Sequence, residues 1–503
     1  MDETMGQNSR EKKSLIFSEA YVNGTWTPSL SGKRFAVTNP LNGEEICSVP
    51  NMNAEDCEIA IQKAHEAFPA WRDRLPAERA RLLMRWRDLI LEHRDELAKI
   101  MVDEQGKPLP EARGEVNYGA SFIQWFAEEA VRDQGSIIPP FARGRRLLVL
   151  KQAVGVVGAI TPWNFPNAMI TRKCAPALAV GCTVVVKPAE DTPLSALALA
   201  HLAELAGFPP GVFNVLTTDR EGASEVGKRL CKDPFVKKIG FTGSTQIGKT
   251  VMAQASSTVK RVSLELGGNA PFIIFDDADL ELALKGLFAS KFRNAGQTCI
   301  CANRIFVHES IIDTFTERLL ERTSKLKIGG GHERGVEIGP LINERALERV
   351  SALVSRAIEE GASLLLGGKR INHELKADPK GKFFAPTVFA EVTQEMQLAR
   401  EEIFGPIVSL ISFKDEAQVI QMANDTPYGL AAYLFTEDHR RIWRVSEALE
   451  YGMVGVNDGA ISSAVAPFGG VKESGLGREG STWGLDEFTE MKYVMLGGLD
   501  RDP

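Results

Sequence analysis

The chain has 503 residues, of which 44% are hydrophobic and 25% charged, as in an ordinary globular protein. At roughly 150 residues per domain, this length predicts two to four domains with large cores. Its 59 Lys and Arg against 66 Asp and Glu give a net charge of −7, which argues against binding to nucleic acid. The longest uncharged, mostly apolar stretch, 175–186, is far shorter than the ~20 residues that cross a bilayer.

The N-terminus and the cysteines indicate the compartment in which the protein works. The N-terminus mixes acidic and basic residues without an apolar centre, which argues against a signal or transit peptide. Seven cysteines, an odd number found mostly in apolar or helical stretches, indicate free thiols in a reducing compartment. We therefore expect a cytoplasmic enzyme with no membrane and no nucleic-acid partner.

The first elements in the chain favour packing over chemistry. We expect an irregular arm over the first ~35 residues, because they are polar. One helix should follow the N-cap Asn53, and a second should run from Pro76 to Gly106, with Pro108 just beyond it. The apolar, β-branched segment 145–157 predicts extended structure.

Short apolar strands then alternate with helices in two series. The first series has expected strands at 183–186, 212–216, 238–241 and 261–264, and helices at 193–206, 222–230 and 246–255. The second has strands at 271–275, 304–308, 407–413 and 453–456, and helices at 280–292, 313–326 and 344–360. This alternation predicts two α/β domains with parallel sheets, which meet near Leu266 and bind ligands at the carboxyl ends of their strands.

Two glycine-rich motifs suggest other functions. Residues 243–250, GSTQIGKT, match a phosphate-binding loop between a strand and a helix, and Asp276 and Asp277 resemble the acidic strand end of a magnesium site. Taken alone, these features keep a P-loop nucleoside triphosphatase as an alternative. The GLGREG pattern at 475–480 fits a dinucleotide fingerprint, but no strand precedes it, so we expect a loop. The histidines have no metal-ligand spacing, and we expect no metal site.

Three residues together indicate covalent catalysis. Cys299 follows the glycine turn Gly-Gln-Thr, Glu265 ends an expected strand between two leucines, and Asn164 lies in the rigid turn TPWNFP. A buried carboxylate is costly unless it is paired or used. A thiol, a carboxylate and an amide donor at strand ends that face one another supply a nucleophile, a base and an oxyanion donor. A catalytically silent protein of the same fold would be expected to lack one of them.

The chain resembles the aldehyde dehydrogenase superfamily over nearly its whole length. The matching motifs, in the order of the family, are TPWNFP (161–166), KPAE (187–190), FTGST (241–245), LELGG (264–268), GQTC (296–299), EEIFGP (401–406) and PFGGVKESGLGREG (467–480). The resemblance implies two doubly wound α/β domains, a Rossmann-like cofactor domain and a catalytic domain, with a β bridging hairpin for oligomerisation. The implied ranges are 1–140 and 156–266 (NAD-binding), 141–155 and 482–503 (bridging) and 267–481 (catalytic).

The resemblance also implies roles for individual residues. Cys299 corresponds to the nucleophile, Asn164 with the Cys299 N–H to the oxyanion hole, and Glu265 to the base that activates water for hydrolysis of a thioester. The implied cofactor contacts are Trp163, Asn164, Lys187, Pro188, Ala189, Glu190, Gly243, Ser244, Leu266, Glu402 and Phe404. A carboxylate at position 190 accepts from a ribose hydroxyl and repels a 2′-phosphate, which predicts NAD, with NADP less favoured. In this family FTGST faces the cofactor pyrophosphate, which speaks against the triphosphatase.

Among family members the succinate-semialdehyde dehydrogenases are the most similar. A semialdehyde acid carries a carboxylate that guanidinium binds through two parallel hydrogen bonds, so we expect Arg172, Arg293 and Ser462 to bind substrate. Glutarate semialdehyde and 2-oxoglutarate semialdehyde stay open as substrates, because one methylene is worth only ~1–3 kcal/mol. Two interpretations of Cys301 stay open: a redox partner that forms a reversible disulfide with Cys299, as in some relatives, or a structural thiol without a redox role. The bridging hairpin implies a homodimer or homotetramer.

Overall fold

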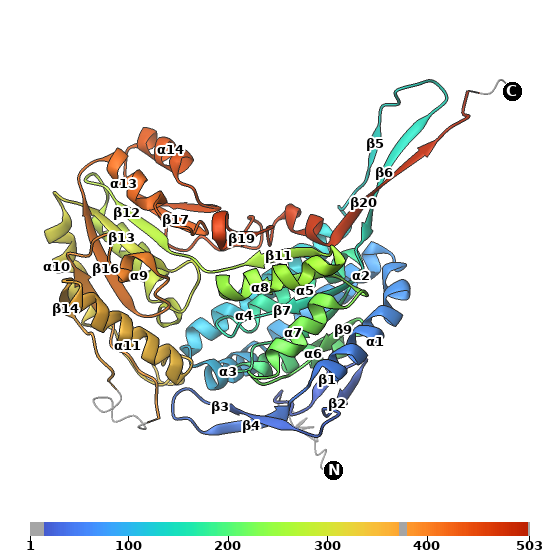
Figure 1. Cartoon of the computed structure of the whole chain (residues 1–503), viewed down its shortest axis with the longest axis horizontal. Helices are drawn as coiled ribbons and strands as arrows, with labels where there is room; N and C mark the ends of the chain where they lie inside the picture. Colours follow the sequence, from blue (N-terminus) through green and yellow to red (C-terminus); the bar gives the residue numbers. More distant parts are fainter. Residues whose placement is uncertain (1–14, 372–379, 501–503) are drawn as a thin grey trace, which may run out of the picture.

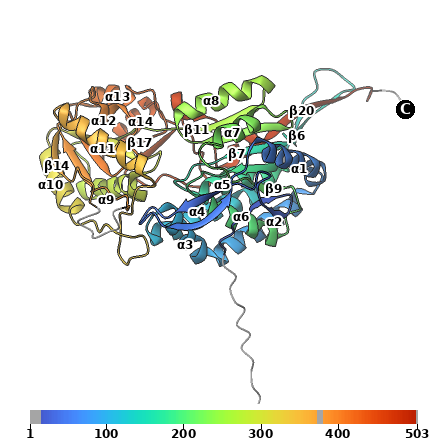
Figure 2. The same cartoon turned by 60° about the horizontal axis from the view of Figure 1, so that its bottom comes forward.

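The computed structural model describes residues 15–371 and 380–500 and has two α/β lobes with a β-sheet arm (Figure 1). The α/β class predicted from the sequence is confirmed. The two lobes lie side by side in both views, and each is built around its own large sheet (Figures 1 and 2). Across the described ranges, no helix is long and apolar enough to cross a membrane.

The first lobe contains an eight-stranded sheet whose order is β19-β11-β10-β7-β8-β9-β1-β2. Its strands are β1 (Ala20–Val22), β2 (Thr25–Thr27), β7 (Val156–Ile160), β8 (Thr183–Lys187), β9 (Phe213–Val215), β10 (Val236–Thr242), β11 (Arg261–Glu265) and β19 (Gly475–Leu476). The five central strands β11, β10, β7, β8 and β9 are parallel. Because Val184 and Val186 face one core and Val185 the opposite one, helices cover both faces of the sheet.

The helices of the first lobe divide between those two cores. One face is covered by α2 (Pro76–Glu92), α4 (Leu109–Glu129), α5 (Ala168–Val180) and α6 (Pro193–Ala206), with α3 (Arg94–Gln105) beside them. The other face is covered by α1 (Ala54–Arg72), α7 (Ala223–Lys232) and α8 (Thr245–Ala255). This doubly wound arrangement places the crossovers where the alternating sequence predicts them.

The structure corrects the expected beginning of the chain. The irregular arm is wrong from residue 20 onward, since β1 and β2 form a hairpin that extends the first sheet, and β3 (Arg34–Thr38) pairs with β4 (Glu45–Pro50). Strands of three residues are too short to show a periodic pattern. The first 14 residues of that expected arm lie outside the described residues. Where one helix was expected from Pro76, the structure has two helices that meet at His93. His93 makes no side-chain cap hydrogen bond at the start of the second helix.

The second lobe contains a seven-stranded sheet whose order is β14-β15-β16-β13-β12-β17-β18. Its strands are β12 (Ala270–Ile274), β13 (Ala302–His308), β14 (Ser363–Leu366), β15 (Thr387–Ala390), β16 (Ile407–Phe413), β17 (Ala431–Phe435) and β18 (Met453–Val456). Its helices are α9 (Leu280–Lys291), α10 (Ile312–Thr323), α11 (Glu344–Glu359), α12 (Gln397–Arg400), α13 (Glu416–Asn424) and α14 (His439–Ala448). The chain passes between the lobes more than once, because β19 returns to the first sheet although it falls in the range 267–481.

A three-stranded antiparallel sheet projects from the first lobe as an arm (Figure 1). It is formed by β5 (Ser136–Ile138), β6 (Arg146–Ala153) and β20 (Thr489–Leu496). The predicted extended segment 145–157 is therefore shared between two sheets. It breaks at Gly155, whose φ of +133° lets the chain turn from β6 into β7.

Candidate active site

The site is built on the edge of the first sheet where its parallel strands end. Asn164 lies in the turn that follows β7, Lys187 is the last residue of β8, and Glu265 is the last residue of β11. Thr242, which ends β10, pairs in register with Glu265. Since parallel strands end at one edge of a sheet, these polar side chains are brought to the same side of the lobe.

Asn164 is held in a buried turn that touches the segment before Cys299. Its Nδ2 donates a hydrogen bond of 3.1 Å to the backbone oxygen of Gln297, which leaves the second amide hydrogen for another acceptor. Its Oδ1 is buried and has no hydrogen-bond partner among the residues described. The side chain therefore retains an unused donor and an unused acceptor beside the nucleophile loop.

Cys299 follows a tight turn, Arg293–Gly296, in which Asn294 and Ala295 have left-handed backbone conformations with φ of +52° and +54°. Two consecutive non-glycine residues in the left-handed region are strained and persist only where surrounding contacts hold them. The neighbouring segment approaches closely, because a Cβ on Gly268 would lie 2.3 Å from the Cys299 oxygen. Burial raises the pKa of the Cys299 thiol to about 12, and the charge of Arg172 opposes that rise.

Glu265 is buried, and neither of its carboxyl oxygens has a hydrogen-bond partner within the described part of the chain. Burial raises the pKa of this carboxyl well above its usual range, and the charge of Glu479 raises it further. Arg172 and Lys173 oppose the shift. A buried carboxyl without partners is costly for the fold, and such groups are concentrated at functional sites.

A small cavity opens beside Cys299 and brings together the three residues expected to bind substrate. Its lining consists of Arg172, Arg293, Ser462, Cys299, Tyr118, Phe165, Met169, Thr298, Ile300 and Phe468. The arginines come from different lobes, one from α5 and one from the turn before the nucleophile. Guanidinium groups and a hydroxyl on the walls of an otherwise aromatic and aliphatic cavity suit a small aldehyde that carries an anionic group.

Arg172 is fully buried and already has an anionic neighbour. It forms an ion pair with Glu479, lies 4.0 Å from the centre of the Phe468 ring, and contacts the Tyr118 hydroxyl at 3.5 Å. Its Nη2 has no hydrogen-bond partner among the described residues. Arg293 lies 4.7 Å from the centre of the Phe165 ring. Thus Arg172 is fixed by Glu479 and still presents a free donor.

Sequence reasoning missed Tyr118, Phe468 and Glu479 at this site. Tyr118 belongs to α4, which was not predicted, and Phe468 belongs to a C-terminal motif that was quoted but given no role. Glu479 forms ion pairs with both Arg172 and Lys173. The available signal was the pair of adjacent cations in an otherwise apolar helix, which must meet a carboxylate when buried.

The expected cofactor residues line the strand edge next to this cavity. Ser244 caps α8 and accepts from the Ile247 N–H at 3.4 Å, so that helix presents its N-terminus at the strand ends, as phosphate groups require. Gly243 and Gly248 pack so closely that a Cβ on either would meet the side chain of Phe241 or Leu266 at 2.5 Å or less. The Gly243 N–H also donates to the backbone oxygen of Glu265 at 3.1 Å.

The remaining cofactor candidates lie on both sides of that edge. Glu402 accepts from the Gly268 N–H at 3.0 Å, and burial raises the pKa of its carboxyl to about 7. Phe404 meets Trp163 edge to face, with ring centres 5.6 Å apart. Lys187 is buried, which lowers its pKa, and its Nζ lies 3.8 Å from Glu190, beyond the turn that contains Pro188 and Ala189.

The donors and acceptors at this edge fit a nicotinamide dinucleotide. The hydroxyls of Thr161 and Thr242, at the ends of β7 and β10, are buried and lack a hydrogen-bond partner among the residues described. Together with the amine of Lys187 and the carboxylates of Glu190 and Glu402, they offer groups for ribose hydroxyls and for a pyrophosphate. The fit is one of chemistry and position on the sheet.

Comparison with known proteins agrees with this geometry. A family model described as the aldehyde dehydrogenase family matches residues 26–494. This chain belongs to the aldehyde dehydrogenase family. It is an enzyme, an oxidoreductase of a family whose members use NAD or NADP.

The relatives differ in the substrate that their names give. The chain is 53% identical to the 3-sulfolactaldehyde dehydrogenase of Pseudomonas putida, covering 97% of this chain and 99% of the relative. It is also 53% identical to the NADP-dependent succinate-semialdehyde dehydrogenase of Escherichia coli K12, covering 96% and 98% of the two chains. A glutarate-semialdehyde dehydrogenase of Pseudomonas aeruginosa is 52% identical over 96% and 99%.

Solved structures show the same fold over the same length. A succinate-semialdehyde dehydrogenase from Burkholderia pseudomallei has a TM-score of 0.94 at 50% identity, covering 97% of this chain and all (100%) of the other. A betaine aldehyde dehydrogenase from Staphylococcus aureus, solved with NAD+, has a TM-score of 0.93 at 36% identity and covers 97% of each chain.

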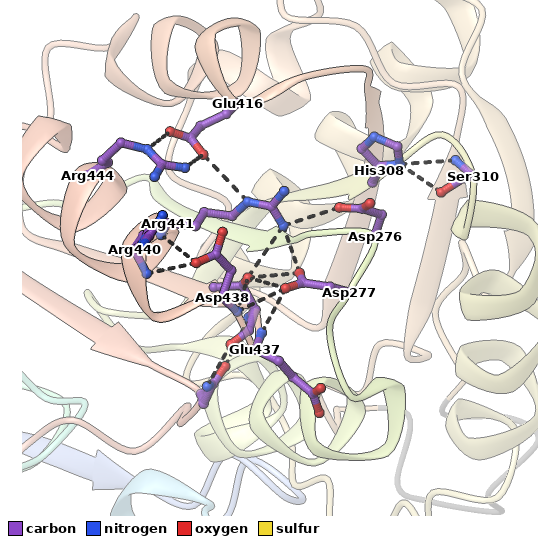
Figure 3. A network of polar contacts seen from close by, with 12 residues as sticks. Asp276, Asp277, His308, Ser310, Glu416, Glu437, Asp438, Arg440, Arg441 and Arg444 are labelled. Atoms are coloured by element: carbon purple, nitrogen blue, oxygen red, sulfur yellow. Dashed lines mark hydrogen bonds and ion pairs between the residues drawn. The ribbon is translucent and has the colours of Figure 1, made fainter.

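The triphosphatase alternative is wrong. Lys249 is exposed on α8 and pairs with Glu473 at 2.9 Å. Asp276 and Asp277 belong to the other lobe, where both pair with Arg441 (Figure 3). Asp277 also accepts from the N–H groups of Glu437 and Asp438, just before α14. The two halves of the supposed nucleotide site therefore lie on different sheets. No group of three or more potential metal ligands occurs within the described ranges.

Cys301 is close to Cys299 in sequence and is a free, buried thiol here, as Cys299 is free. Its Sγ donates to the Lys291 oxygen at 3.6 Å, and burial raises its pKa. A disulfide between the two cysteines stays a prediction from the sequence.

Proposed function

We propose that this enzyme oxidises succinate semialdehyde to succinate with NAD. The observation that carries the proposal is the cavity in which Arg172, Arg293 and Ser462 lie on the walls around Cys299. A substrate whose carboxylate is bound by guanidinium groups presents its aldehyde carbon to the thiol at the other end of the same cavity. Two of the named relatives act on straight-chain semialdehyde acids, as their names state, which supports this substrate class.

The chain's own residues divide the chemistry among three groups. The Cys299 thiol gives up its proton to water as its sulfur attacks the aldehyde carbon. The developing oxyanion accepts from the free Nδ2 hydrogen of Asn164 and from the Cys299 N–H, each donor being worth ~3 kcal/mol. NAD, when bound, supplies the oxidising power by accepting a hydride. Glu265 then takes a proton from the water that attacks the thioester carbon, and the C–S bond breaks to release the acid and the thiol.

The preference for NAD rests on the acidic turn after β8. Glu190 and Asp191 follow each other at its end, and burial together with the Glu190 charge raises the pKa of Asp191 to about 6. A phosphate on the ribose would meet this negative charge, whereas a free 2′-hydroxyl donates to it. The NADP specificity in the name of the E. coli relative belongs to that protein and sets the comparison for the test.

We also propose that the enzyme works in the cytoplasm as a homodimer or a dimer of dimers. The free cysteines, all seven within the described residues, are compatible with a reducing compartment. The sheet arm supplies the surface for association.

The deciding experiment is a substrate panel with NADH formation followed by absorbance. Succinate semialdehyde, glutarate semialdehyde, 3-sulfolactaldehyde and an uncharged aldehyde of equal length are compared by kcat/KM, each with NAD and with NADP. We expect the highest kcat/KM for succinate semialdehyde with NAD and no product with Cys299→Ala. Arg293→Met should lower kcat/KM for the acids but not for the uncharged aldehyde. Arg172→Met should lower it for both, and more strongly for the acids, because Arg172 also lowers the pKa of Cys299. A higher value for one of the other acids would replace the substrate and leave the mechanism standing.

A further inference from the structure

A buried segment outside the motifs quoted above lies against both halves of the active site. Residues 104–115 run from the end of α3 into the first turns of α4 and lie against the second lobe. A Cβ on Gly339 would lie 2.2 Å from the Gly106 oxygen, and the Leu109 N–H donates to the Gly331 oxygen at 2.9 Å. The segment is therefore fixed against the second lobe while α4 packs against α5 of the first.

Lys107 reaches from this segment to the Asn164 turn. Its side chain is buried, and its Nζ donates to the backbone oxygen of Asn164 at 2.8 Å. The same ammonium forms an ion pair with Glu115 and lies 4.1 Å from the centre of the Phe165 ring. The two hydrogen bonds and the cation–π contact of this ammonium thus go to groups that surround one turn.

Glu115 holds the far end of the same turn. Its second oxygen accepts from the Asn167 N–H at 2.9 Å and from the Ala168 N–H at 3.1 Å, where α5 begins. The Asn167 side chain makes no cap hydrogen bond at the start of α5. The carboxylate of Glu115 caps the helix instead. The ion pair consequently ties residue 164 and residues 167–168 to one point.

The same segment also holds the turn before the nucleophile. Gln105 Nε2 donates to the Asn294 Oδ1 at 2.9 Å, and Glu111 accepts from the Asn294 N–H at 2.8 Å. Asn294 Nδ2 in turn donates to the Asn164 oxygen at 3.1 Å, the atom that Lys107 also contacts. These contacts with the segment hold Asn294 in its left-handed backbone conformation.

We propose that Lys107 and Glu115 are positioning residues that aim the amide of Asn164 at the oxygen of the reacting aldehyde. The proposal rests on the oxyanion role of Asn164 put forward above. A buried ion pair adds little to stability compared with apolar residues of the same size, but it fixes the geometry of the groups that it touches. Displacement of a catalytic donor by about 1 Å can cost on the order of 100-fold in rate.

A double-mutant cycle on kcat tests this role. Lys107→Met keeps an unbranched side chain that is one heavy atom shorter and removes its charge, and we expect kcat to fall by about tenfold to hundredfold. Asn164→Ala should lower kcat by ~100-fold. If Lys107 acts through Asn164, adding Lys107→Met to Asn164→Ala should change kcat less than about twofold, because no amide is left to aim. The KM for NAD should not change in Lys107→Met, since Lys107 is not among the expected cofactor contacts.

Lys238 provides a matched control. It is also a fully buried lysine, its Nζ lies 2.8 Å from Glu487, and it makes no contact with the Asn164 turn. Lys238→Met should lower the melting temperature to a similar extent as Lys107→Met and leave kcat unchanged. Should Lys107→Met not fold, Glu115→Gln serves in its place, since it keeps an oxygen for the α5 N–H groups and presents an amide to the ammonium.

The outcomes separate the two hypotheses. If Asn164→Ala leaves kcat unchanged, the oxyanion role fails and the positioning role fails with it. If Asn164→Ala lowers kcat but Lys107→Met does not, or if the two effects multiply in the double variant, only the positioning role is overturned and the proposed function stands. Equal loss of kcat in Lys238→Met and Lys107→Met would assign the effect to general destabilisation.

Discussion

The pKa values of Cys299 and Glu265 are both raised, for the same physical reason. Burial raises the pKa of each group, because a thiolate or a carboxylate in an apolar environment loses its hydration. The charges of Glu402 and Glu265 also raise the pKa of Cys299. Arg172 is the cation that opposes both shifts, so a substrate carboxylate bound to Arg172 should weaken its support of the thiolate.

The first prediction concerns the reactivity of Cys299 toward iodoacetamide in the absence of cofactor and substrate. Because the thiol pKa is raised to about 12, the thiolate fraction should increase about tenfold for each pH unit between pH 6 and pH 10. The alkylation rate, measured by mass spectrometry of the peptide that contains Cys299, should rise with pH without a plateau in this range. A plateau near pH 8 would contradict the raised pKa.

Arg172→Met supplies the matched variant for that measurement. It removes the cation that lowers the Cys299 pKa, so alkylation at a given pH should become slower. Faster alkylation would mean that the arginine acts mainly by blocking access to the sulfur.

At the scale of elements, the turn between β8 and α6 is held by hydrogen bonds to Glu104 of α3. The Leu194 and Ser195 N–H groups at the start of α6 each donate to Glu104 at 2.8 Å. Glu104 is buried, and burial raises its pKa to about 8. A turn anchored at the helix that follows it holds the Glu190 carboxylate in a fixed place, which is what discrimination between NAD and NADP requires.

The second prediction follows from that fixed position. Glu190→Ser removes the charge that repels a 2′-phosphate and leaves a hydroxyl that can donate to it. We expect the ratio of kcat/KM for NADP to that for NAD to rise by about tenfold to hundredfold, because like charges in contact cost a few kcal/mol. Glu225→Ser, an acidic residue in the first turn of α7, is the control and should leave the ratio unchanged. An unchanged ratio in Glu190→Ser would place the cofactor ribose elsewhere.

At the scale of the whole molecule, the sheet arm exposes apolar side chains that a single chain does not cover. Ile137 is 78% exposed and Met491 is 76% exposed, and Phe141 at the tip is 70% exposed. A long, exposed apolar edge strand tends to pair with another chain. The arm extends away from both lobes (Figure 1), so a second copy has access to it.

The third prediction is that the arm forms the contact between subunits. Met491→Glu places a charge within its exposed apolar surface, and sedimentation velocity should show a shift from dimer or tetramer toward monomer. Trp443→Glu is the control, since Trp443 is 68% exposed on α14 of the other lobe and should leave the assembly unchanged. Loss of assembly with Trp443→Glu alone would move the interface to the second lobe.

The prediction of the fold from the sequence succeeded where strands are short, apolar runs between helices. The strands 407–413 and 453–456 match β16 and β18 to the residue, since continuous apolar runs between helices have few other interpretations. The prediction was wrong at β1 and β2, and at the break in the helix near His93. Short edge strands and local helix breaks depend on contacts with distant residues such as Val215, which no local pattern records.

The local motifs of the sequence by themselves determined the family and predicted the catalytic roles of Cys299, Asn164 and Glu265, because each of these motifs lies within a few consecutive residues. Only the tertiary structure decided what surrounds them: Glu479 beside Arg172, Lys107 beneath Asn164, and Tyr118 and Phe468 on the cavity wall. These partners lie tens to hundreds of residues away in the chain. A buried charge gives its own position in the sequence, but its partner is fixed only when the chain has folded around it.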